Sequence, residues 1–143
     1  MPDRRLWLRV RGGGHALLLP AGDIREVVPA GEVSPLPGRP AGIQGVVIHQ
    51  GEFLPVLAWK DLPGCGQGRG PTAALAILRP RLGLPLEGVD GTGPIEEEAI
   101  RAVAEADPAS AWCAGTILIE GIEFRVLDAD RLVLLLRRLR GER

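Results

Sequence analysis

The stretch that most restricts the fold of this chain is residues 33–59, and its first part is rich in proline. Residues 34–40 hold Pro35, Pro37 and Pro40. Because proline fixes φ and has no backbone N–H to donate, this part can form neither a helix nor a central strand. It predicts an ordered, extended loop.

The second part of this stretch predicts a β-hairpin. Residues 45–49 and 53–59 are two apolar arms that flank Gln50-Gly51-Glu52, a pattern typical of strands joined by a tight turn. Pro55 lies inside the second arm and predicts an edge or bulged position. The stretch contains no nucleophile, no carboxylate pair and no cluster of metal ligands. We therefore expect a scaffold or a binding module.

Short strands are predicted along most of the remaining chain. They fall at residues 6–10, 15–20, 72–78, 82–89, 115–120 and 123–127, with a helical bend running into a strand at 21–28. Roughly eight to ten short strands, about ten residues apart, are typical of small β-barrels or a sandwich. Each half carries a glycine-centred hairpin, at Gly51 and at Gly121.

Two segments predict helix. In residues 94–106, Pro94 suits a first turn, Glu96 to Glu98 favour the positive end of the macrodipole, and apolar residues recur at helical spacing. The second helix begins at a cap, Asp128 or Asp130, and runs to about Leu139. Its predicted buried side consists of Leu132, Leu135, Leu136 and Leu139.

The remaining local patterns predict a loop and a turn. Residues 64–71 are rich in glycine and predict a flexible loop. The Asp90-Gly91-Thr92-Gly93 sequence predicts a turn.

The composition narrows the function classes. The length of 143 residues predicts one domain, or two small subdomains that share a core. That core should be mainly aliphatic, since 45% of the residues are hydrophobic and 3% aromatic. With 17 basic and 18 acidic residues, the chain is not expected to bind nucleic acid.

The sequence has no signal peptide and no stretch of transmembrane length, so we expect a cytoplasmic protein without direct membrane insertion. Cys65 and Cys113 lack companion ligands, and no metal site or disulfide follows from them.

Several motifs in order carry a family resemblance. After the first hairpin come Ile24-Arg25-Glu26-Val27 and Val33-Ser34-Pro35-Leu36-Pro37. The central hairpin, residues 43–56, and the ending Leu127-Asp128 before a leucine-rich helix follow. In this order and spacing, the chain resembles the CheW-like domain, the coupling adaptor of bacterial chemotaxis.

The resemblance implies a fold and a task. The fold is mainly β: two intertwined five-stranded SH3-like β-barrels with a short C-terminal helix. The single domain, residues 1–143, would comprise barrel subdomains at roughly 15–64 and 72–130. The implied task is that of a non-enzymatic adaptor without a cofactor, which joins the cytoplasmic tip of chemoreceptors to the regulatory domain of a CheA-type histidine kinase. Family members dock the receptor tip in an apolar groove between the barrels.

The resemblance also suggests which residues contact partners. They are Glu26, Val46, Ile48, His49, Gln50, Gly51, Glu52 and Leu54. Gln50 stands where the family usually has arginine, which predicts that a charge-assisted contact is lost at this turn. Ala58 stands where the family usually has an acidic residue.

Two other readings remain open. A divergent member of the family could act in another two-component or pilus-motility pathway. A small-ligand-binding β-barrel is the other reading, because fold does not fix function. A pocket that joins His15, His49 and a carboxylate would support that reading.

Overall fold

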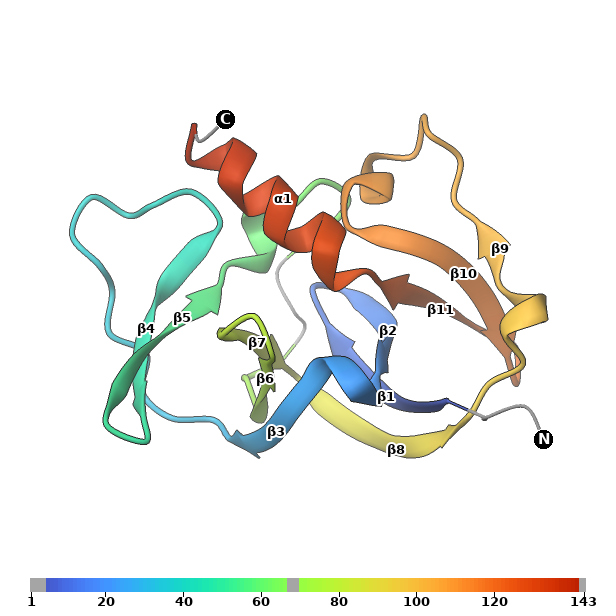
Figure 1. Ribbon diagram of the computed structural model, residues 1–143, viewed down its shortest axis with the longest axis horizontal. Coiled ribbons are helices and arrows are strands. Elements are labelled where there is room, and N and C mark those ends of the chain that lie inside the picture. Colours follow the sequence, from blue (N-terminus) through green and yellow to red (C-terminus); the bar gives the residue numbers. More distant parts are fainter. Residues whose placement is uncertain (1–4, 67–69, 142–143) are drawn as a thin grey trace.

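The computed structural model describes residues 5–66 and 70–141. It contains two antiparallel-rich sheets and a C-terminal helix (Figure 1). The strands are β1 (Leu6–Gly12), β2 (His15–Pro20), β3 (Ile24–Pro29), β4 (Ile43–His49), β5 (Glu52–Leu57), β6 (Ala74–Leu78), β7 (Leu82–Leu86), β8 (Gly88–Pro94), β9 (Arg101–Ala102), β10 (Cys113–Ile119) and β11 (Ile122–Leu127), and the helix is α1 (Ala129–Leu139). Single 3₁₀ turns occupy Ala21–Asp23, Trp59–Asp61, Glu97–Ala99 and Pro108–Ala111.

The two sheets are interleaved along the chain. One sheet has the order β8-β1-β2-β11-β10-β9, and the other β3-β6-β7-β5-β4. The strands from β3 to β7 are thus inserted between β2 and β8 of the six-stranded sheet. This confirms the predicted mainly β fold with two intertwined units. The subdomain limits of 15–64 and 72–130 stay a prediction, and sheet membership divides the chain at other points.

Corresponding hairpins occur in the two sheets. β4 and β5 turn at Gln50 and Gly51, with φ of 53° and 76°. β10 and β11 turn in the same way at Glu120 and Gly121, with φ of 51° and 80°. Positive φ at both central residues gives a turn whose twist matches that of the flanking strands. Each hairpin also has a register shift beside a glycine, at Gly45 and Gly115.

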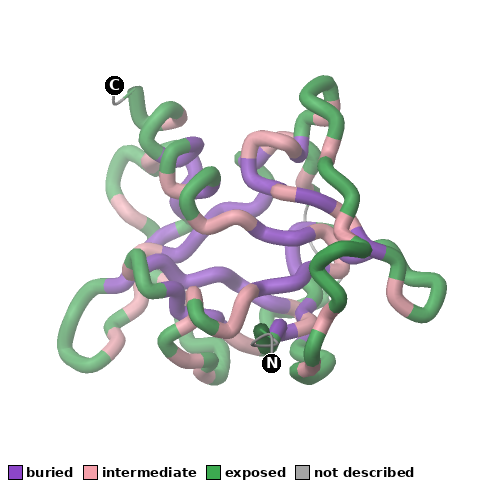
Figure 2. Tube along the Cα trace, turned by 45° about the vertical axis from the view of Figure 1, so that its right-hand side comes forward, coloured by how far each residue is buried: buried purple, intermediate pink, exposed green. Residues whose placement is uncertain are grey.

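The main hydrophobic core joins both sheets to the helix. Buried residues follow the central strands, whereas the exposed ones lie on loops and hairpin ends (Figure 2). Asp128 caps α1 by accepting from the Arg131 N–H, and Leu132, Leu135 and Leu136 are buried, which confirms the predicted helix. A smaller cluster, centred on Trp7, Leu18 and Phe124, fills the six-stranded sheet.

The predicted helix at residues 94–106 is wrong. This segment instead contains the end of β8, one 3₁₀ turn and the two-residue strand β9. Ile95 and Ile100 pack against the smaller core cluster, and β9 pairs with β10 at Gly115 and Thr116. Tertiary contacts therefore override the local helix signals.

Two smaller predictions are also corrected, and a third is tested only in part. Asp90 to Gly93 do not form a turn but lie in β8, where Gly91 to Gly93 pair with β1 and Asp90 falls at a register shift. The single strand expected at 82–89 is divided between β7 and β8. Part of the predicted loop at 64–71, residues 67–69, lies outside the described residues.

Pro55 is not at a sheet edge, because β5 lies between β7 and β4. The N–H and C=O of Val46, its partner on β4, both bond to Ser34 at 2.8 Å. In an antiparallel pair this means that Pro55 directs its nitrogen away from β4. The missing donor thus costs no bond between β4 and β5.

Candidate functional site

The hairpin of β4 and β5 presents an apolar face to solvent. Ile48 and Phe53 are directly opposite each other and are 74% and 72% exposed. Val46 and Pro55, the pair two residues further along on the same face, are partly buried. Alternation along a strand places all four side chains on one surface. We call these four residues the hairpin face.

The opposite face of the hairpin carries ion pairs. His49 and Glu52 form the last pair before the turn. Nε2 of His49 lies 2.6 Å from Oε1 of Glu26 on β3, and Arg81, at the turn between β6 and β7, lies 3.0 Å from Glu52. β3 and β4 are the two ends of the five-stranded sheet. The Glu26–His49 pair therefore links the two edges of this sheet beside the hairpin turn.

This arrangement brings together most of the residues that the sequence suggested. Val46, Ile48, His49, Gln50, Gly51 and Glu52 share one hairpin, and Glu26 reaches it through His49. The loss of a charge-assisted contact at position 50 stays a prediction, and the neighbouring His49 contacts Glu26 within the chain. Gln50 itself is exposed at the turn.

Leu54 needs a correction, and Phe53 was missed. Leu54 is 0% exposed and belongs to the core, so it cannot contact a partner in the folded state. Its neighbour Phe53 is exposed instead. The alternation of side chains along the strand could have identified Phe53 as the exposed residue, since a buried Leu54 requires Phe53 to face outward with Ile48.

Other exposed apolar side chains lie outside the hairpin face. Val27 on β3 and Val89 on β8 are 40% and 42% exposed, and both strands are sheet edges. Leu118 and Ile122 are exposed on the hairpin of β10 and β11. Sequence reasoning did not select any of these four residues.

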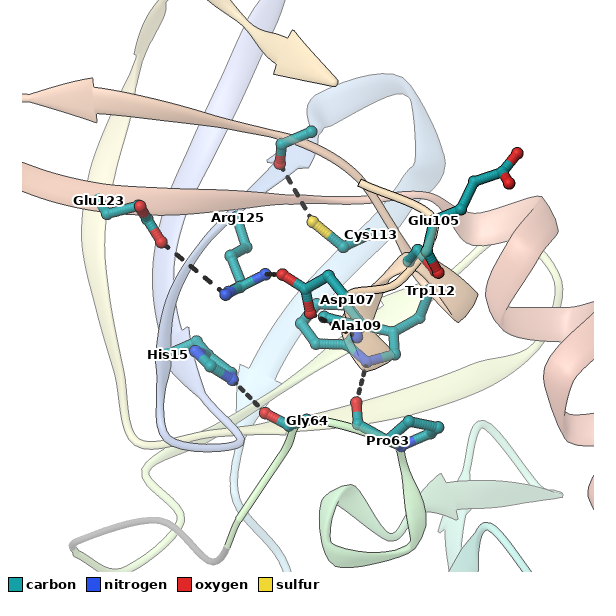
Figure 3. A network of polar contacts seen from close by, with 12 residues as sticks. His15, Pro63, Gly64, Glu105, Asp107, Ala109, Trp112, Cys113, Glu123 and Arg125 are labelled. Carbon is teal, nitrogen blue, oxygen red and sulfur yellow. Dashed lines mark hydrogen bonds and ion pairs between the residues drawn. The ribbon is translucent and has the colours of Figure 1, made fainter. Parts of the chain in front are cut away.

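A polar network in the six-stranded sheet is the nearest arrangement to a catalytic cluster (Figure 3). Asp107 accepts from the Ala109 N–H at 2.9 Å and pairs with Arg125 at 3.4 Å. The Ala109 hydrogen bond, followed by the charge of Arg125, lowers the pKa of Asp107. Both interactions hold Asp107 as a carboxylate that fixes the loop before β10, so its role is structural.

The two histidines do not form a joint site. His15 Nε2 lies 2.6 Å from the Gly64 carbonyl oxygen, and its ring lies 5.8 Å from that of Trp112. His49, in the other sheet, pairs with Glu26. Among the described residues, no group of three or more His, Cys, Asp or Glu side chains could hold a metal ion. The pocket that would support a small-ligand barrel is therefore not formed by these residues.

The thiols beside this network are not activated. Burial raises the pKa of Cys65 to about 12 and also raises that of Cys113. Cys113 donates to the Gly115 carbonyl at 3.1 Å. Since the thiolate is the reactive form, both cysteines are poor nucleophiles at neutral pH.

We expect native Cys65 to react with iodoacetamide at pH 8 roughly a thousandfold more slowly than an unstructured cysteine peptide. The reason is its small thiolate fraction. Mass spectrometry of time points would measure the rate, with the Cys113→Ser variant to isolate Cys65. The same protein in denaturant serves as the control and should react at the peptide's rate. A native rate equal to that of the peptide would contradict a half-buried, protonated thiol.

None of the helices in the described residues is long and apolar enough to span a membrane.

Comparisons with known proteins agree with the fold and the order of the motifs. The model of the CheW-like domain family matches residues 6–136. The protein FrzA of Myxococcus xanthus is 40% identical over 86 residues, which are 53% of this chain and 54% of FrzA. The chain thus matches about half the length of this relative. The crystal structure of the scaffolding protein TtCheW from Thermoanaerobacter tengcongensis superposes with a TM-score of 0.80 and 21% identity, covering 92% of this chain and 89% of that one.

Proposed function

The chain belongs to the CheW-like domain family, a family of non-enzymatic scaffolds in chemosensory signal transduction, and we propose that it couples chemoreceptors to a CheA-type histidine kinase in the cytoplasm. The hairpin face is the observation that most directly supports the proposed binding to the kinase. Ile48 and Phe53 form a contiguous apolar pair at the end of a rigid hairpin. Aromatic residues, phenylalanine among them, are enriched at protein interfaces relative to the rest of the surface.

The charged residues beside the hairpin face support a specific interface. Glu26–His49 and Glu52–Arg81 fix the hairpin end against β3 and the turn of β6 and β7. A pre-ordered hairpin loses little conformational entropy when a partner docks. We infer that the kinase regulatory domain docks on the hairpin face and that the ion pairs set its orientation.

For the receptor, the proposal rests on the two sheet edges. Val27 and Val89 expose apolar side chains on β3 and β8, one from each sheet. We infer that an apolar helical hairpin such as a receptor tip contacts such residues with its apolar face.

The kinase half is tested by calorimetry with the purified regulatory domain of the CheA-type kinase from the same genome. We expect the wild-type chain to bind, and Phe53→Ser to weaken binding at least tenfold, because the central aromatic anchor is removed. The matched control is Leu134→Ser, since Leu134 is 49% exposed on α1 and outside the hairpin face. This control should bind as the wild type does.

Two outcomes would contradict different parts of the proposal. Absence of wild-type binding would contradict kinase coupling and favour a divergent member acting in another pathway. Wild-type affinity in Phe53→Ser would leave coupling intact but remove the hairpin face as the interface. A Gln50→Arg variant distinguishes the divergent reading further, because restoring the usual arginine should then strengthen binding.

A further inference from the structure

A cavity at one end of the six-stranded sheet has no part in the proposed kinase or receptor contacts. Its lining residues come from the start of β1, the end of β2 and the start of α1. Its volume is about 540 Å³. The apolar wall includes Trp7, Ile100, Ala114 and Val126, which belong to the smaller core cluster or pack against it. The cavity is therefore continuous with ordered core side chains.

Trp7 has an unusual place in this wall. Its side chain is buried, with 3% of the residue exposed, and Nε1 has no hydrogen-bond acceptor among the described residues. The indoles of the other two tryptophans each donate to a carbonyl, Trp59 to Pro85 at 2.6 Å and Trp112 to Pro63 at 2.7 Å. A buried donor without a partner is costly and calls for an acceptor from outside the protein's own side chains.

The rim of the cavity is acidic. Four carboxylates, Asp23, Glu97, Asp128 and Asp130, stand against a single guanidinium, that of Arg5. Glu97 pairs with Arg5 and Asp128 with Arg131. The side chains of Asp23 and Asp130 have no ion-pair or hydrogen-bond partner within the part of the chain that the structure describes. Two carboxylates from separate elements are thus free to meet a cation.

We propose that this cavity binds a partner peptide through an arginine side chain. The aliphatic part of the arginine fills the space against Trp7 and Ile100, and its guanidinium meets Asp23 and Asp130. Nε1 of Trp7 is closed to solvent in this structure, so a carbonyl of the same peptide accepts from it after a small shift of the indole on binding. The site is separate from the hairpin face, so it would add a partner to the proposed coupling rather than repeat it.

The experiment uses two capped tripeptides, acetyl-Leu-Arg-Leu-amide and acetyl-Leu-Gln-Leu-amide, added to ¹⁵N-labelled protein. The three indole N–H signals are observed by NMR and assigned with Trp7→Phe. We expect the arginine peptide to shift the Trp7 signal selectively. Asp23→Asn and Asp130→Asn should each weaken this binding about threefold to fivefold, as an exposed charge pair does. The control Glu32→Gln, an exposed carboxylate that does not line the cavity, should leave it unchanged.

Several results would overturn the proposal. Equal shifts with the glutamine peptide would exclude recognition of charge, and no shift at millimolar arginine peptide would exclude the site. A Trp7 signal that moves with protein concentration, without peptide, would assign the cavity to a second copy of the chain. Kinase binding by Asp23→Asn should be unchanged, so failure here is distinguishable from failure of the adaptor proposal.

Discussion

Replacing Trp112 with alanine is expected to lower the free energy of unfolding by about 3–5 kcal/mol. Trp112 is 0% exposed and belongs to the main core. Its indole N–H donates to the Pro63 carbonyl at 2.7 Å, which ties the turn before β10 to the segment after β5. Alanine leaves both a large cavity and a carbonyl without its donor. Against a typical total of about 5–15 kcal/mol, this loss is a large part of the stability.

Urea unfolding followed by circular dichroism measures this change. The Trp112→Phe variant keeps much of the volume but loses the indole donor, so its loss should be clearly smaller than that of alanine. Leu134→Ala, at a half-exposed helix position, should change the free energy of unfolding by less than about 0.5 kcal/mol. A Trp112→Ala protein within 1 kcal/mol of the wild type would show that this side chain does not hold the two sheets together.

The parts of the fold that were predicted from sequence depend on local rules. Gln50-Gly51 and Glu120-Gly121 specify turns through positive φ, and the strands beside them follow. Asp128 specifies the start of α1 through its side-chain cap. Each of these features is determined by residues close together in the chain, so a sequence pattern is enough to identify them.

The predictions that were wrong or missing concern features that depend on contacts between residues far apart in the chain. Residues 94–106 carry local helix signals but do not form a helix, because Ile95 and Ile100 pack against the smaller cluster. The Glu26–His49 pair joins β3 and β4, consecutive strands that lie at opposite ends of the five-stranded sheet, and no local pattern indicates it. For the same reason the sequence did not reveal the cavity beside Trp7, which is lined by residues from several strands and from α1.

The choice of Leu54 instead of Phe53 as a contact residue is a different kind of error. Both residues are apolar, and composition cannot tell which one faces the core. A hairpin with a two-residue turn fixes the pairing of Ile48 with Phe53 and of Val47 with Leu54. The side that is buried is then decided by the other strands that cover it, because a one-residue slip would move every side chain to the opposite face.

The Gly45→Ala substitution is the second large effect expected, and it acts on the support of the hairpin face. A Cβ at position 45 would lie 2.3 Å from the Ser34 carbonyl oxygen and 2.9 Å from its carbonyl carbon. Because these are backbone atoms, the proline-rich loop has to move away. That movement would break the two hydrogen bonds between Ser34 and Val46, both 2.8 Å long. We expect a loss of about 2–4 kcal/mol from overpacking and the broken bonds together.

Gly31→Ala is the matched control for this change, because a Cβ there meets nothing within 4 Å and the backbone is not left-handed. Its free energy of unfolding should equal or slightly exceed that of the wild type. Hydrogen exchange locates the effect: in Gly45→Ala the amides of Ser34 and Val46 should lose protection first. Gly115→Ala should act similarly in the other hairpin, since its Cβ would lie 2.7 Å from the Arg101 carbonyl oxygen. If Gly45→Ala were as stable as Gly31→Ala, the close approach of the loop would not be what holds the hairpin, and the rigidity proposed for the hairpin face would need another source.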